Sequence, residues 1–192
     1  MLQIFLKMLS VTLFTSLIQS TVFSGGLGID ESIKGARKPR YLVMYGLWVT
    51  FFSLTLAVAG RFITPLLAKI TPRSASQDFI AYIIILVCIY IGAAALCKYL
   101  LGASKKYMNS LGFCAFNSLV LSMPVLGGTS LSKAVAAAIG AGIAYILSVL
   151  IIRGGMRHIN ANKYIPAFFR GTPALFIYIS LVALALSGIS GV

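Results

Sequence analysis

Acidic side chains and histidine are scarce in this sequence of 192 residues. It contains three acids, Asp30, Glu31 and Asp78, and one histidine, His158. This shortage excludes enzymes that work with paired carboxylates, His-rich metal sites and acidic calcium loops.

Cysteine is also sparse. The three present, Cys88, Cys97 and Cys114, lie in apolar runs and form no CxxC pair. A disulfide framework is therefore not expected.

Apolar residues dominate what is present. Hydrophobic residues make up 59% of the chain and charged residues 10%, and the mean hydropathy is +0.99. A soluble domain carries about 25% charged residues. The net charge of +13 would suit nucleic acid in a soluble protein, but in so apolar a chain it is typical of the cytoplasmic loops of a membrane protein. We therefore predict an all-α integral membrane protein with no nucleic-acid partner.

Six apolar segments meet or approach the roughly 20 residues that a helix needs to cross a bilayer. They are Leu2–Phe23, Tyr41–Gly60, Phe79–Cys97, Ser110–Leu126, Ala134–Ile152 and Ala174–Gly191. The first segment is long, follows no basic cluster and precedes no Ala-x-Ala-like cleavage site, so we expect a retained helix and not a signal peptide. The sequence thus predicts six transmembrane helices in a single membrane domain, residues 1–192.

Lysine and arginine gather on one predicted side of the membrane. The loops after the first, third and fifth segments hold Lys34, Arg37, Lys38, Arg40, Lys98, Lys105, Lys106, Arg153, Arg157, Lys163 and Arg170. The opposite side holds Lys7, Arg61, Lys69, Arg73 and Lys133. Because the basic side is normally cytoplasmic, we expect a bacterial plasma (inner) membrane protein with both termini outside.

The first and fourth segments share a pattern at an offset of 102 residues. Residues 14–26 and 116–128 align Phe14 with Phe116, Ser16 with Ser118, Leu17 with Leu119, Ser20 with Ser122, and Gly25-Gly26 with Gly127-Gly128. These are the first helices of two three-helix halves, and an odd number of spans inverts the second half. The pattern predicts two inverted repeats, residues 1–100 and 101–192, whose first and fourth helices are interrupted.

Glycine pairs and Pro124 weaken both segments as helices, and freed backbone groups in a membrane need polar partners. The residues predicted to face a central axis are Thr15, Ser16, Gln19, Ser20, Gly25, Gly26, Asn117, Ser118, Ser122, Gly127 and Gly128. A single membrane serine more often bonds to its own helix. For the amides Gln19 and Asn117, a functional and a structural role are equally supported.

The last third carries a further pattern. An Ala- and Gly-rich span leads to Ile-Ile-Arg153, followed by Ile165-Pro166, Phe169-Arg170-Gly171 and a closing apolar run with late glycines. The pattern resembles the RnfA/NqrE family, six-helix membrane subunits of the Rnf and sodium-pumping NADH:quinone oxidoreductase complexes. The resemblance implies pairing with a sister subunit of inverted topology (RnfE/NqrD-like) or with a second copy, and contact with other membrane and flavoprotein subunits and with lipid.

One departure from the family concerns its cofactor. The resemblance implies two cysteines, one from each interrupted helix, that hold a [2Fe–2S] cluster with a sister subunit, and such a cluster needs about four thiolates. Gly26 and Leu27 stand at the first ligand position, and Asn117 is followed by Ser118 where the family has cysteine. Cys114, one turn earlier, is the one candidate metal ligand. We expect no cofactor bound fully by this chain, with a shared cluster as the remaining possibility.

Two functions remain open at this point. The first is a subunit of an Rnf/Nqr-like ion-translocating electron-transport complex, which would catalyse nothing alone and would not contribute a full set of iron–sulfur ligands. The alternative is a small solute or ion transporter, or a channel-like protein, built on the same inverted repeat.

Replacing Cys114 with serine tests the ligand assignment. If Cys114 packs as a small hydrophobe, Cys114→Ser leaves the redox activity of the native complex intact. The measurement is electron transfer in membranes that contain equal amounts of the two proteins. A collapse of activity at equal amounts would instead show that Cys114 is a ligand.

Overall fold

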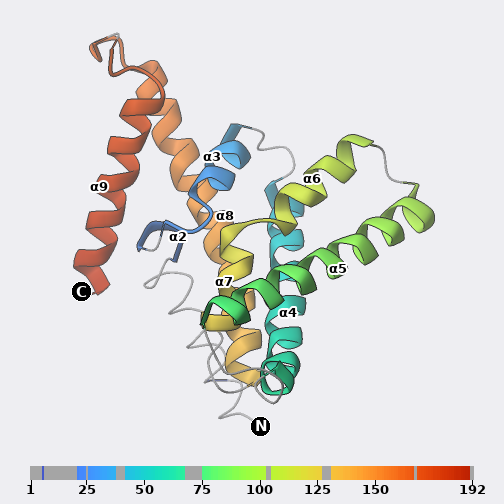
Figure 1. The fold of residues 1–192 in the computed structure, drawn as a ribbon. Helices are drawn as coiled ribbons and strands as arrows, with labels where there is room; N and C mark the ends of the chain where they lie inside the picture. The colour runs from blue at the N-terminus through green and yellow to red at the C-terminus, as the bar shows by residue number, and fades with distance from the viewer. Residues whose placement is uncertain are drawn as a thin grey trace.

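The computed structural model describes residue 6 and residues 21–24, 26–37, 42–67, 75–102, 105–126, 131–166 and 168–190. Within these ranges all regular structure is helical, which confirms the predicted class (Figure 1). The helices are α2 (Thr21–Ser24), α3 (Ile29–Arg37), α4 (Leu42–Leu67), α5 (Ala75–Leu101), α6 (Lys105–Ala115), α7 (Ser118–Leu126), α8 (Leu131–Ala161) and α9 (Thr172–Ser190).

Most predicted spans correspond to these helices. Four stretches are long and apolar enough to cross a membrane: Leu42–Phe62, Phe79–Tyr99, Met108–Val125 and Leu131–Ala161. A shorter apolar stretch, Thr172–Gly188, forms most of α9. The predicted first span lies outside the described residues except for Leu6 and the beginning of α2. The helices thus agree with an integral membrane protein, while the inverted repeats and the orientation stay predictions.

Helices α4 and α8 form the central pair of the fold. Glycine permits their close approach, because a Cβ added to Gly142 would clash with Thr50 Oγ1 and lie 2.9 Å from Thr50 Cβ. A Cβ on Gly46 would likewise clash with Ile146. Small residues let membrane helices gain dispersion contacts that larger side chains would prevent. The Ala- and Gly-rich beginning of α8 therefore serves packing.

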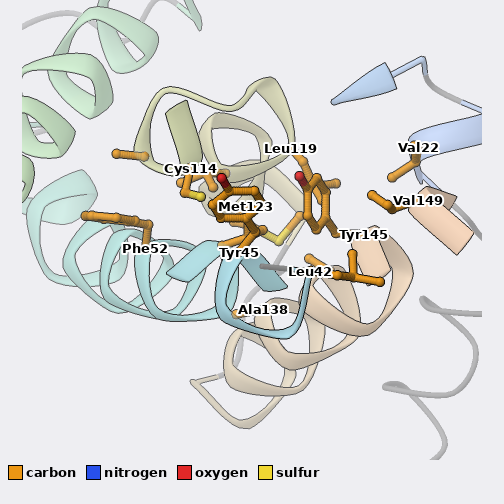
Figure 2. Close-up of a cluster of buried hydrophobic side chains, with 14 of the residues drawn as sticks. Val22, Leu42, Tyr45, Phe52, Cys114, Leu119, Met123, Ala138, Tyr145 and Val149 are labelled. Carbon is orange, nitrogen blue, oxygen red and sulfur yellow. The ribbon is translucent and has the colours of Figure 1, made fainter. Parts of the chain in front are cut away.

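The core fills the space between this pair and α7. Figure 2 shows Tyr45 of α4 and Met123 of α7 in the middle of the cluster, with Phe52 of α4 on one side and Tyr145 of α8 on the other. Leu119 of α7, beside Tyr145 in this view, is fully buried. A smaller contact attaches α9 to α8: Tyr178 packs against Gly155, and its hydroxyl donates to the Ile151 carbonyl at 3.3 Å.

Helices α5 and α9 lie at the periphery of the fold (Figure 1), and both carry broad exposed apolar faces. The exposed side chains on them are Phe79, Ile80, Ile84, Ile91, Leu96, Phe176, Ile177, Leu181 and Leu184. In water, faces of this extent would drive association, whereas in a bilayer they suit lipid or a neighbouring helix.

Substitution of Gly142 tests the contact between α4 and α8. We expect Gly142→Ala to lower the free energy of unfolding by roughly 1–3 kcal/mol, because the helices must separate to admit a methyl group. The measurement is equilibrium unfolding of the purified chain in mixed micelles. The matched control is Gly154→Ala on the same helix, where an added Cβ meets nothing within 4 Å. Equal effects of the two variants would contradict the close approach.

Candidate site at the crossing of two interrupted helices

The fourth predicted span is interrupted at Asn117. Helix α6 ends at Ala115 and α7 begins at Ser118, with Phe116 and Asn117 outside both. The Leu119 N–H donates to Asn117 Oδ1 at 2.9 Å, so the amide caps the first turn of α7. Short polar side chains form hydrogen bonds with nearby backbone groups. Asn117 can therefore terminate one helix and cap the start of the next.

The position of this break corrects one part of the sequence interpretation, which expected Pro124 to interrupt this segment. Helix α7 continues through Pro124 to Leu126. Pro124 lies in the last turn of this nine-residue helix, where the missing N–H costs a single hydrogen bond. Gly127 and Gly128 lie outside the described residues.

A second break separates α2 from α3. Gly26 has φ +68° and Gly28 has φ +76°, a left-handed conformation that residues with a Cβ rarely adopt. The Gly28 carbonyl accepts a hydrogen bond from the Ser32 N–H at 2.9 Å, so Gly28 is the residue at which α3 starts.

The two breaks lie in direct contact. The Gly28 N–H donates to Ser118 Oγ at 2.8 Å. A Cβ added to Gly28 would lie only 2.7 Å from Asn117 Oδ1, so Gly28 is required by packing as well as by its φ angle. We call this contact of Gly28, Asn117 and Ser118 the crossing. It joins residues 90 positions apart in the sequence.

The sequence interpretation missed Gly28, which lies two residues beyond the predicted stretch. The signal was available: Gly28 precedes Asp30 and Glu31, and two acids in a first turn are typical of a helix N-terminus. An N-terminus at this place would have put Gly28 directly before the helix, as a candidate cap residue.

The crossing gathers hydrogen-bond donors. Helices α3 and α7 both begin there, and the N-terminus of a helix carries a partial positive charge. Asn117 is fully buried, and its Nδ2 has no hydrogen-bond partner within the described part of the chain. A buried donor left unpaired costs about 1–3 kcal/mol, so this amide is a costly feature of the crossing.

The outer side of the first turns of α3 has the chemistry of a solvated surface. Lys34 and Asp30 form an exposed ion pair one turn apart. The hydrogen bond to Asp30 raises the pKa of Lys34, and the charges of Asp30 and Glu31 act in the same direction against partial desolvation. Both ends of the pair are exposed, so its contribution to stability is small.

The remaining predicted site residues fall into two groups. Ser118 and Gly26 are exposed, while Ser122 is half-buried and donates to the Leu119 carbonyl of its own helix at 2.8 Å. The others that the sequence singled out lie outside the described residues: Thr15, Ser16, Gln19, Ser20, Gly25, Gly127 and Gly128.

The donor set at the crossing does not fit an iron–sulfur cluster. Cys114 is 1% exposed and packs among apolar side chains one turn before the break (Figure 2). Ser118 Oγ, at the position where the resemblance implies a cysteine ligand, accepts the hydrogen bond from the Gly28 N–H. Across the residues that the structure describes, no three His, Cys, Asp or Glu side chains gather closely enough to hold a metal ion.

Comparison with known proteins bears on the resemblance. No family model matches the chain. The RnfA protein of Rhodobacter capsulatus, a component of an ion-translocating oxidoreductase complex, is 26% identical over 186 residues, which cover 95% of this chain and 96% of that protein. The protein of the same name from Aromatoleum aromaticum is 40% identical over 78 residues, 39% of this chain and 40% of that protein. These relatives confirm the predicted resemblance to RnfA.

Alanine substitutions at the two left-handed glycines test the crossing. Gly26→Ala meets nothing within 4 Å, so we expect only the backbone cost of about 1–2 kcal/mol in the free energy of unfolding. Gly28→Ala adds the contact with Asn117 and should cost at least about 1 kcal/mol more. Equilibrium unfolding of the purified chain measures both. Equal losses would show that the tight contact with Asn117 does not form.

Proposed function

We propose that this chain is a membrane subunit of an Rnf/Nqr-like ion-translocating electron-transport complex. Similarity to the RnfA protein of Rhodobacter capsulatus over 95% of the chain supports this assignment. So do the apolar helices, which match the predicted spans from the second to the sixth. Catalysis in this proposal belongs to the assembled complex and its cofactors.

The crossing is the observation that carries the proposal, because one edge of it, at Ser118, is open to the surroundings near the middle of the apolar stretch Met108–Val125, while Gly28 and Asn117 are buried. Ser118 and Gly26 are exposed there, and the Phe116 side chain is 45% exposed beside them. Polar groups and irregular backbone at membrane depth do not face lipid. A sister membrane subunit of inverted topology, or a second copy of this chain, covers the crossing in our proposal.

The proposed subunit does not supply a full set of iron–sulfur ligands. The whole sequence has three cysteines, and only Cys114 lies near the crossing. A serine hydroxyl is a far poorer iron ligand than a thiolate. In this proposal, a cofactor at the subunit interface is held mainly by the partner.

We propose the orientation with both termini outside and the basic loops in the cytoplasm. In Figure 1, the beginning of α6, the end of α8 and the beginning of α9 lie toward one end of the molecule, and the end of α4 and the beginning of α8 lie toward the other. The loops at the first end carry most of the lysine and arginine. The positive-inside rule then favours a cytoplasmic location for that end, in the bacterial inner membrane.

One observation favours the second candidate, a transporter for a small solute or ion. The buried Asn117 Nδ2 lies where two helix N-termini converge, and half-helix ends with polar side chains form the binding sites of many transporters. Under that alternative, the chain alone moves its solute across a membrane.

Purification of the tagged chain from native membranes tests the proposal. We expect a sister membrane subunit and flavoprotein subunits to co-purify with it, and the chain expressed alone to contain no stoichiometric iron. Phe116→Ala should reduce recovery of the sister subunit several-fold, because Phe116 flanks the crossing. The matched control, Phe176→Ala on α9, alters another exposed phenylalanine and should leave recovery unchanged.

Three outcomes would contradict the proposal. An iron–sulfur signal in electron paramagnetic resonance from the isolated chain would overturn the ligand assignment. Absence of redox subunits, together with solute uptake by the chain alone in vesicles, would support the transporter. Equal recovery with both phenylalanine variants would remove the crossing from the interface.

A further inference from the structure

A basic surface without acids lies at the end of α8. Arg157, Lys163 and Arg170 are all exposed there. No Asp or Glu occurs anywhere after Asp78, so no acidic residue of the second half of the chain offsets these charges. Such a surface attracts anions over about a Debye length.

Three aromatic side chains stand among these cations. Tyr164 is 96% exposed, Phe168 84% and Phe169 46%, and the two phenylalanine rings pack edge to face at 5.3 Å. Holding large apolar rings in water is unfavourable, so an ordered display of this kind marks a contact surface. We name Arg157, Lys163, Tyr164, Phe168, Phe169 and Arg170 the loop surface.

Hydrogen bonds hold this loop in one conformation. The Phe169 and Arg170 N–H groups donate to the Pro166 carbonyl at 3.0 and 3.1 Å. Arg170 Nη2 donates to the Lys163 carbonyl at 3.2 Å and closes the loop. Gly171 leads into α9 with φ +93°. The cations and rings are therefore displayed together.

The packing of α9 on α8 places the loop surface at one end of two neighbouring apolar helices. The 31 residues of α8 extend about 46 Å, which exceeds the roughly 30 Å of hydrocarbon. The contacts of Tyr178 with Gly155 and Ile151 fix α9 against the end of α8. The apolar run of α9 begins at Ala174, so in a bilayer that α8 and α9 enter together the loop just before it would lie at the level of the headgroups.

We propose that the loop surface binds the headgroups of anionic phospholipids. Charge complementarity supplies the preference, since juxtamembrane lysine and arginine gain about 1 kcal/mol each near an anionic leaflet. Aromatic rings favour this boundary layer, and the exposed Phe176 and Ile177 continue the surface into the lipid-facing side of α9. Binding of an acidic protein partner would explain the positive charge of the loop surface. It would not explain why the exposed aromatic side chains continue into the lipid-facing side of α9. The inference is independent of the electron-transport role.

Fluorescence quenching by brominated lipid tests this binding. The reporter is the full chain with Phe168→Trp and Trp48→Phe, in vesicles of equal phosphatidylglycerol and phosphatidylcholine with one or the other lipid brominated. We expect brominated phosphatidylglycerol to quench at least about twofold more strongly. Raising the salt concentration should bring this ratio toward unity.

Two triple variants separate a local site from general attraction. Arg157→Gln, Lys163→Gln and Arg170→Gln together should abolish the preference for phosphatidylglycerol. The matched control removes three other exposed cations, through Arg61→Gln, Lys98→Gln and Lys133→Gln, and should retain it. Equal quenching by the two lipids in the reporter, or equal loss in both triple variants, would overturn the proposal. Absence of quenching by either lipid would also overturn it and would indicate a protein-binding surface.

Discussion

The hydrogen bond from the Gly28 N–H to Ser118 Oγ, 2.8 Å long, joins the two places where helices stop short within this fold. Two helices begin at this contact, and one buried amide, that of Asn117, both caps α7 and packs on Gly28. A membrane interior offers no water to satisfy an interrupted backbone, so a break survives only where the protein supplies partners. The pair α4 and α8 then provides the rigid support against which α3 and α7 are held.

The sequence predicted the class and the membrane spans because these depend on length and hydropathy, which local composition determines. The segment Ser110–Leu126 was also correctly expected to be interrupted. The expectation that Pro124 interrupts the segment was wrong, because a proline near the end of a short helix costs little, whereas an asparagine that caps the next helix ends a helix in mid-segment. The expectation for Gly127 and Gly128 stays untested, since both lie outside the described residues. Helix propensity identifies both Pro124 and Asn117 as residues that disfavour a helix, but tertiary contacts determine at which of them the helix ends.

Gly28 illustrates what local patterns leave out. Its hydrogen bond to Ser118 joins residues 90 positions apart, which no window of sequence covers. The same limit applies to the proposed repeat. The offset of 102 residues pairs Asn117 with Thr15, which lies outside the described residues, so the internal symmetry stays a prediction. The RnfA relatives agree with the resemblance that the last third of the chain indicates.

The open flank at Phe116 and Ser118 bears on how the subunit that we propose would be made and kept. In that assembly, a hydroxyl and a broken helix sealed only by the partner would distinguish an unassembled copy from an incorporated one. Synthesis in step with the partner would then be a physical requirement, and a surplus of either subunit would expose this flank to the bilayer.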